Sequence, residues 1–174
     1  MGRIWELHKY INTIFTRINE MPPVYIHMLG VSQACALIAI KRGDNAELAT
    51  IAGLLHDIAS LRNHDVEPYK SHGLTPQNHA EIGAEIAMSI LKELNLTSEQ
   101  ENEIICGAIK KHSDKDNIDT PFDEVLKDAD VLAHGFFDIT SKNFRGYRWD
   151  KICQELGVNN CREITPIISI LDGV

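Results

Sequence analysis

A histidine and an aspartate stand next to each other at the end of an apolar run, and both are side chains that bind metal ions. The run is Ile51-Ala52-Gly53-Leu54-Leu55, and His56 and Asp57 follow it directly. Neighbouring residues on a helix point about 100° apart, so these two side chains can reach one ion only from adjacent sides. A His-Asp pair alone is weak evidence for a metal site. Its meaning depends on whether other segments bring matching ligands.

Five polar side chains continue the apolar faces of expected helices: His27, His56, His79, His112 and Asp130. Each lies three or four residues from apolar neighbours, and residues at that spacing share one helix face. Burying one unpartnered polar group costs about 1–3 kcal/mol, whereas the stability of a whole protein is only about 5–15 kcal/mol. The cost is offset if the groups converge, and a divalent metal centre is built from such imidazoles and carboxylates. Each residue taken alone also fits a hydrogen-bonded core position, a helix cap or a salt bridge.

The elements that must position these residues are helices. Apolar spacing predicts helical segments at about 4–18, 23–41, 45–57, 75–95, 98–113, 120–135, 150–156 and 165–171. Ser98 and Glu101 have the spacing of a capping box. Because no stretch shows sustained strand alternation, we predict an all-α fold, a single-domain helical bundle of about six to eight helices.

The polar segments between these helices carry further expectations. The stretch from about Ser60 to Pro76 is a polar loop between His56-Asp57 and His79, and we expect it to cover the site as a lid. The run Asp114-Lys115-Asp116-Asn117 is expected to be a solvated loop. Four histidines show no consistent placement against an apolar face and are set apart from the candidate site: His8, His64, His72 and His134.

Composition restricts the partners. The chain of 174 residues suits one domain, and its net charge of −8 and pI of about 5.4 argue against a nucleic-acid partner, which needs a basic face. No apolar run is judged long enough to span a membrane, so no membrane partner is expected. The start of the chain is interrupted by charges and its four cysteines are scattered, which indicates a cytoplasmic protein with reduced thiols. A homodimer is compatible with the sequence.

The order of the candidate ligands resembles the HD superfamily of metal-dependent phosphohydrolases. The phrases that carry the resemblance are residues 27–31, 54–58, 79–83, 109–113 and 127–132. The resemblance implies an HD-like domain over residues 1–174, with a metal-binding core at about 24–133 and with segments 1–20 and 150–172 packed on it. It also implies four ligands for a first metal, namely His27, His56, Asp57 and Asp130. His79 and His112 match the additional ligands of members that hold a second metal, with Asp57 bridging the two ions.

One position departs from the family pattern. Many family members with two metals have a lysine that touches substrate phosphate three residues after the aspartate, and this chain has Ser60 there. Phosphate binding must then come from other cations, although each of them also fits an ordinary solvated surface charge. The candidates for substrate binding are Arg62, Lys70, Lys110, Lys111 and Arg145.

Two ions that share a carboxylate suit hydrolysis. Such ions lie about 3.5–4 Å apart, bind a phosphate oxygen and lower the pKa of a bridging water, which makes hydroxide at neutral pH. The candidate catalytic residues are Asp57, as the bridge, and Asp128, which could orient a ligand or accept a proton but fits an exposed helix acid equally well. Imidazole and carboxylate ligands suit Fe, Mn, Zn, Co or Ni without choosing among them.

The resemblance implies a metal-dependent phosphohydrolase that cleaves a phosphate ester or anhydride of a small nucleotide-like substrate. A di-iron oxygenase on the same scaffold and a non-catalytic nucleotide-binding regulatory domain remain as alternatives. Two ions are favoured because His79 and His112 would otherwise be spare imidazoles on apolar faces. Gly83, one turn after His79, would let a neighbouring helix approach closely. The missing lysine at Ser60 favours a single ion instead.

Overall fold

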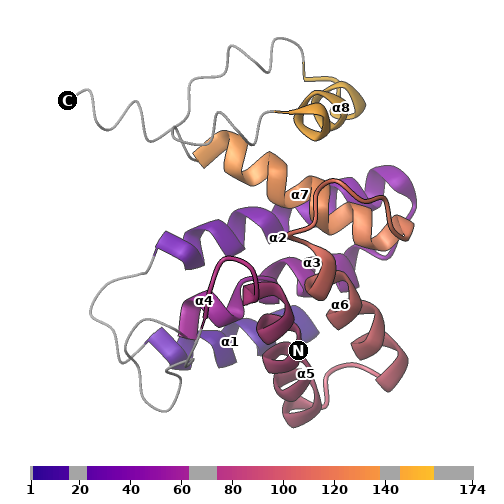
Figure 1. Ribbon diagram of the computed structural model, residues 1–174. Coiled ribbons are helices and arrows are strands. Elements are labelled where there is room, and N and C mark those ends of the chain that lie inside the picture. The colour runs from indigo at the N-terminus through magenta and orange to yellow at the C-terminus, as the bar shows by residue number, and fades with distance from the viewer. Residues whose placement is uncertain (1, 16–22, 63–73, 138–145, 159–174) are drawn as a thin grey trace, which may run out of the picture.

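The protein is a bundle of α-helices. The structure, a computed structural model, describes residues 2–15, 23–62, 74–137 and 146–158, and in these ranges it has eight helices and no strand (Figure 1). The all-α prediction is therefore confirmed. The helices are α1 (Arg3–Phe15), α2 (Pro23–Arg42), α3 (Ala46–Leu55), α4 (Ile58–Arg62), α5 (His79–Leu94), α6 (Glu99–Lys111), α7 (Pro121–Phe137) and α8 (Tyr147–Leu156).

Helix α2 lies at the centre of the bundle, between α3 and α7 (Figure 1). Its buried face includes Met28, Val31 and Ile38, which are fully covered by their neighbours. By length and composition alone this helix could cross a membrane, so the expectation drawn from apolar run lengths was wrong on that point. In this fold its apolar length instead packs against two other helices and forms the core.

Two glycines allow ligand-bearing segments to pack closely. A Cβ atom on Gly53 of α3 would lie 2.7 Å from the Cα of Ser32 in α2. A Cβ atom on Gly83 of α5 would lie 3.2 Å from the carbonyl oxygen of His56. The predicted close approach at Gly83 is thus confirmed, and it places the start of α5 against the end of α3.

Several helix ends differ from the prediction by a few residues. Helix α3 ends at Leu55 and α4 begins at Ile58, so a helical turn stands where the expected loop began. The next helix, α5, begins at His79 and not at Thr75. The capping box at Ser98 is confirmed. Residues 63–73, the middle of the expected lid, and the expected helix at 165–171 lie outside the described residues.

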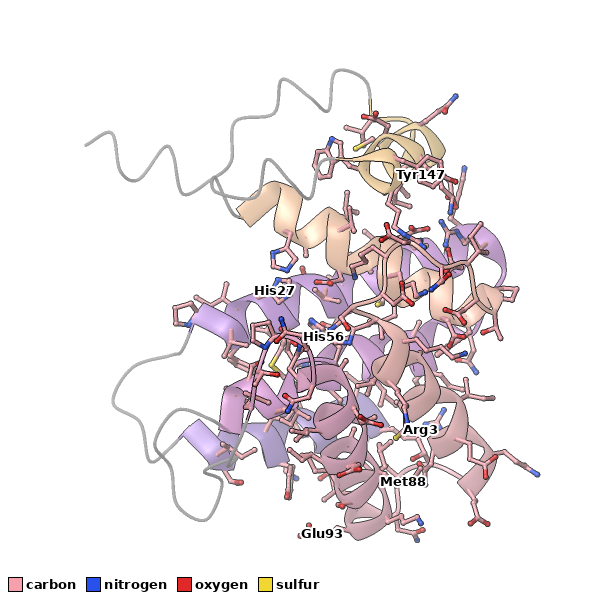
Figure 2. The ribbon with its side chains drawn as sticks, viewed as in Figure 1. Arg3, His27, His56, Met88, Glu93 and Tyr147 are labelled. Atoms are coloured by element: carbon pink, nitrogen blue, oxygen red, sulfur yellow. The ribbon has the colours of Figure 1, made fainter. Side chains whose placement is uncertain are left out.

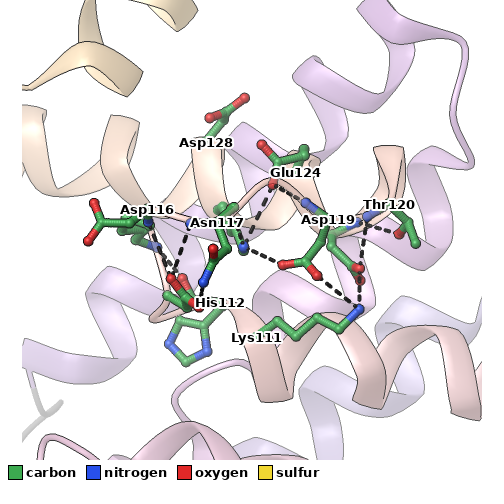
Figure 3. A network of polar contacts seen from close by, with 12 residues as sticks. Lys111, His112, Asp116, Asn117, Asp119, Thr120, Glu124 and Asp128 are labelled. Carbon is green, nitrogen blue, oxygen red and sulfur yellow. Dashed lines mark hydrogen bonds and ion pairs between the residues drawn. The ribbon is translucent and has the colours of Figure 1, made fainter.

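The connection between α6 and α7 is solvated at Asp114, Asp116 and Asn117, as expected, but buried cations hold its backbone. The fully buried Lys127 donates to the carbonyl of Asn117 at 2.9 Å and to Asp119 at 2.6 Å (Figure 3). Arg148 of α8 donates to the carbonyl of Lys115 at 2.6 Å. These bonds fix the backbone around Lys115, whose side chain points back toward the end of α6.

Candidate metal centre

Five imidazoles and two carboxylates gather where five helices meet. They come from α2 (His27), the segment after α3 (His56 and Asp57), the start of α5 (His79), the residue after α6 (His112) and α7 (Asp130 and His134). The structure thus brings together all six residues that the sequence analysis selected as ligands. It adds His134, which that analysis had set apart.

The first group of ligand atoms surrounds His27, which lies beside His56 (Figure 2). Its Nε2 atom is 3.0 Å from Asp130 Oδ1 and 3.2 Å from His56 Nε2. The other carboxylate, Asp57, presents Oδ2 to this group at 3.6 Å from His56 Nε2 and 4.0 Å from His27 Nε2. Two ligands about 2.1 Å from one ion are about 3.0–3.4 Å apart at tetrahedral or right angles, so the shortest of these separations suit a shared ion.

The second group surrounds the other oxygen of Asp57. The Nε2 atoms of His79 and His112 lie 3.3 Å from each other, and each lies 3.7 Å from Asp57 Oδ1. Asp57 therefore turns one oxygen to each group, which is the arrangement that a carboxylate bridging two ions requires.

The ring orientation of three histidines leaves Nε2 as the metal-binding atom. The Nδ1 atoms of His56, His79 and His112 lie 2.7–2.8 Å from the carbonyl of the residue three positions earlier. A carbonyl only accepts, so Nδ1 carries the proton and a neutral ring has its lone pair on Nε2. The lone pairs of His79 and His112 then face each other, and a cation between them removes the repulsion.

The carboxylates show the same need for a cation. Oδ1 of Asp57 is buried and accepts no hydrogen bond from the described residues, and Oδ1 of Asp130 faces imidazole nitrogens, with His27 Nε2 at 3.0 Å. A buried carboxylate oxygen without a donor costs several kcal/mol unless a charge compensates it. The donor set, neutral imidazole nitrogen with carboxylate oxygen, is one that divalent Fe, Mn, Zn, Co or Ni accepts. The residues therefore fit the metal that the sequence analysis expected.

The pKa values in the cluster favour the metal-binding protonation states. Burial lowers the pKa of His56 and lowers that of His112 to about 3, so both rings are neutral near pH 7. Burial opposes ionisation of Asp130, but Lys115 and the neighbouring histidines outweigh it and hold the pKa well below its ordinary value. The pKa of His27 is raised, because the Asp130 and Asp57 carboxylates outweigh burial. A metal ion would replace that proton.

Two groups at the centre were missed by the sequence analysis. His134 Nε2 lies 3.4 Å from Asp130 Oδ1, and the available signal was its position one turn after Asp130 on α7. Lys115 donates to Asp130 Oδ2 at 2.6 Å and to the carbonyl of His112 at 2.5 Å. A lysine in a polar run gives no sequence signal for such a place.

Asp128, which was predicted as a candidate catalytic residue, lies away from the ligand cluster and is buried rather than exposed. Its side chain is fully buried, with Arg42 at 2.6 Å and Lys151 at 3.1 Å from Oδ2 and with Arg148 at 3.0 Å from Oδ1. Residues two apart on a helix point about 200° apart, so Asp128 and Asp130 face opposite sides of α7. Asp128 joins α2, α7 and α8.

The predicted substrate-binding cations are not brought to the cluster where the structure describes them. Lys110 is exposed and pairs with Glu81 at 2.9 Å. Lys111 pairs with Asp123 at 2.8 Å and with Asp119 at 3.4 Å, in the polar network of Figure 3. Lys70, Arg145 and the side chain of Arg62 lie outside the described residues.

A cavity of about 370 Å³ opens beside the second group of ligands. Among the described residues, its lining consists of Asp57, Ser60, His79 and the segment from Leu74 to Pro76. Ser60, which stands where many family members with two metals have lysine, thus faces this cavity next to the bridging carboxylate.

Comparison with known proteins agrees with this geometry. Residues 24–135 match the family model of the HD domain. The chain is 28% identical over 169 residues to Ribonuclease Y 2 of Levilactobacillus brevis and 30% identical over 128 residues to Ribonuclease Y of Geobacter metallireducens. These alignments cover 97% and 74% of this chain but only 26% and 21% of the relatives.

A solved structure shares the fold. The crystal structure of a predicted HD superfamily hydrolase from an uncultured Thermotogales bacterium superimposes with a TM-score of 0.59 over 90% of both chains, at 21% identity. Since the family model matches residues 24–135, more than half of the chain, the chain belongs to the HD domain family.

Proposed function

We propose that the protein is a metal-dependent phosphohydrolase that cleaves a phosphate ester or anhydride bond of a small nucleotide-like substrate. The observation that carries the proposal is the position of Asp57, whose two oxygens face two separate groups of imidazole nitrogens. Membership of the HD family supports it. Bound divalent ions would supply Lewis acidity and a nucleophilic water at neutral pH.

The chain itself positions the substrate. The cavity beside Asp57 and His79 has a volume of about 370 Å³, within the usual range of about 300–1,000 Å³ for small-molecule sites. Ser60 and Thr75 provide hydroxyl groups in its lining, and a hydroxyl can donate a hydrogen bond to a phosphate oxygen. Because Ser60 is uncharged, the ions rather than a lysine would neutralise the phosphate at this point.

A second candidate is hydrolysis of a phosphodiester bond in RNA. It is favoured by the ribonuclease Y relatives, and it opposes the expectation of no nucleic-acid partner. The net charge of −8 still disfavours a long nucleic acid held along a basic face. A dinucleotide or the end of a short RNA could be cleaved in the cavity without such a face.

One assay separates these candidates. Metal-free protein is loaded in turn with Fe²⁺, Mn²⁺, Co²⁺, Ni²⁺ or Zn²⁺ and incubated with nucleoside phosphates, dinucleotides and end-labelled oligoribonucleotides, and products are separated by chromatography. We expect hydrolysis of small nucleotides, with Asp57→Asn inactive and the surface variant Lys110→Ala equal to wild type.

Other results would assign the protein to a different class. Cleavage of oligoribonucleotides alone would favour the RNA reaction. Oxygen uptake with Fe²⁺ and no hydrolysis would favour the oxygenase alternative. Nucleotide binding without turnover under every metal would favour a regulatory domain.

A further inference from the structure

His134 lies against the first group of ligands without having been assigned to it. Its Nε2 atom is 3.4 Å from Asp130 Oδ1, similar to the 3.2–3.3 Å between the facing Nε2 atoms of the two histidine pairs in the cluster. Its ring centroid is 4.2 Å from that of His27. The ligand atoms of His27, Asp130 and His134 all lie within 4.8 Å of one another.

The chemistry of His27 decides whether these atoms form a separate site. His27 belongs to one group with His56 and Asp57 and to another with Asp130 and His134. In both groups it faces its neighbours through Nε2. An imidazole nitrogen has one lone pair and binds one ion, so the two groups describe one ion and not two.

Lys115 determines how Asp130 can bind that ion. Its ammonium holds Oδ2 at 2.6 Å, whereas Oδ1 faces His27, His56 and His134 at 3.0, 3.8 and 3.4 Å. Asp130 therefore offers one oxygen to the ion, and Lys115 fixes the other. If Asp130 bound the ion through both oxygens, its second oxygen would fill a further coordination position. Because it binds through one oxygen, that position is left for His134.

We propose that His134 is a fifth protein ligand of the first ion, beside His27, His56, Asp57 and Asp130. The centre is then asymmetric, because the second ion has three protein ligands, Asp57, His79 and His112. Of the two ions, the second has more positions left for substrate. The cavity agrees with this assignment, since its described lining includes Asp57 and His79. This location of substrate rests on the proposed function, whereas the ligand role of His134 does not.

Metal binding tests the ligand role directly. Metal-free wild type, His134→Ala and His134→Gln are titrated with Co²⁺ in competition with a chelator, and the visible absorption of bound Co²⁺, which depends on coordination, is recorded. Gln keeps a hydrogen-bond donor for Asp130 but is a poor replacement for imidazole on the metal. His8→Ala, at a histidine that lies near Tyr25 and outside the cluster, is the matched control.

We expect both His134 variants to bind one of two equivalents at least about tenfold more weakly, since losing even an outer-shell partner of a ligand costs 10–100-fold. Their Co²⁺ spectrum should change, and His8→Ala should match wild type. Wild-type affinity and spectrum in His134→Gln would overturn the proposal and leave His134 as a hydrogen-bond partner of Asp130. The proposal would also be overturned if wild type bound three equivalents of Co²⁺ and either variant lost the third. The two groups of ligands that contain His27 would then hold separate ions.

Inorganic phosphate, as the probe, tests the asymmetry. Its binding to the Co²⁺-loaded protein should be lost in His79→Ala and retained within about threefold in His134→Gln measured at saturating metal. Retention of phosphate binding in His79→Ala together with its loss in His134→Gln would place the open positions at the first ion and overturn the proposed asymmetry. If the metal results hold but no nucleotide is hydrolysed, the proposed function fails while the ligand assignment stands.

Discussion

Helix α7 carries two buried aspartates on opposite faces, and they differ in the number of cations around them. Asp128 faces three cations, Arg42, Arg148 and Lys151. Two further carboxylates, Glu124 and Glu155, pair with the same arginines. Asp130, two residues later, faces one cation, Lys115. Its other neighbours include the imidazoles of His27, His56 and His134.

The charge cluster around Asp128 stabilises the fold by itself, whereas the cluster around Asp57 and Asp130 requires a bound cation. Burial opposes ionisation of Asp128, but hydrogen bonds from Arg42, Lys151 and Arg148 still lower its pKa. Each of its oxygens has a donor, so the cluster is complete within the chain. Asp57 keeps a buried oxygen without a donor among the described residues, and the Oδ1 atom of Asp130 faces imidazole nitrogens rather than a permanent cation. A fold retains such oxygens at a cost, and a cation from outside offsets it.

The largest effect is expected from Asp57→Ala. It removes an oxygen from each group of ligands, so both ions should be lost and hydrolysis should fall at least about a thousandfold, since metal ions supply several kcal/mol to such reactions. At metal concentrations about 100 times the dissociation constant, each bound ion should add about 2.7 kcal/mol to the stability of wild type, and the variant should gain none. Elemental analysis and denaturant unfolding with and without metal measure both effects.

The same variant gives a second comparison in the metal-free state. Removing Asp57 there deletes a buried carboxylate with an unpaired oxygen, so the free energy of unfolding should not fall. A metal-free Asp57→Ala protein much less stable than wild type would show that Asp57 holds the fold in the way that Asp128 does, and the distinction between the two clusters would be lost.

Asp128→Ala should have the opposite pattern. Breaking a buried ion pair costs about 3–5 kcal/mol, and we expect about 3 kcal/mol here because Arg42 and Arg148 keep Glu155 and Glu124. Metal content should remain at the wild-type level. Urea unfolding of the metal-free protein measures the stability loss. A variant of wild-type stability that has lost its metal would restore the catalytic role that the sequence suggested for Asp128.

The sequence contained enough to select six of the residues that meet at the centre. Apolar spacing places His27, His56 and His112 on inner helix faces, and burial cost then requires them to converge. The same reasoning could have recovered His134, because it lies one turn after Asp130. It could also have separated Asp128 from Asp130, because residues two apart cannot share a helix face.

Other features depend on contacts between distant segments and could not be predicted. Asp128 meets Arg42 and Arg148, which are 86 and 20 residues away along the chain. Lys115 reaches Asp130 because Arg148 and Lys127 hold the backbone of its loop. The polar composition of that loop correctly predicts that Asp114, Asp116 and Asn117 are exposed, but it gives no sign of which buried cations bind the carbonyls of the loop.

The stability of the metal-free protein should depend on pH because the buried imidazoles resist protonation in the folded state. His112 has an ordinary pKa of 6.5 and a folded pKa of about 3, so between these values the unfolded chain binds a proton that the folded chain does not. Stability should therefore fall as the pH falls from about 6.5, by up to about 1.4 kcal/mol per pH unit from this group. His27, whose pKa is raised, contributes with the opposite sign and loses its contribution as the pH rises through its folded pKa.

Chemical unfolding between pH 4.5 and 7 measures this dependence. His112→Gln should flatten the slope by about one proton, whereas His8→Ala should change it less because His8 is only partly covered. An unchanged slope in His112→Gln would mean that the buried imidazole does not resist protonation, and the carboxylates would have to account for the acid sensitivity.

The smallest effect concerns how closely the second group of ligands is held. A Cβ on Gly83 would lie 3.2 Å from the His56 carbonyl, so Gly83→Ala should push the start of α5 from the end of α3 by a few tenths of an ångström. Alanine gains up to about 1 kcal/mol of helix propensity, which offsets the crowding, and the net stability should change by less than about 1 kcal/mol. Metal affinity should nevertheless fall about three- to tenfold, because the distance between Asp57 and His79 changes. Gly107→Ala in α6, where an added Cβ meets nothing within 4 Å, should gain stability without changing metal affinity. Equal metal affinity in the two variants would show that the centre tolerates this shift and that its geometry is set by the side chains rather than by helix spacing.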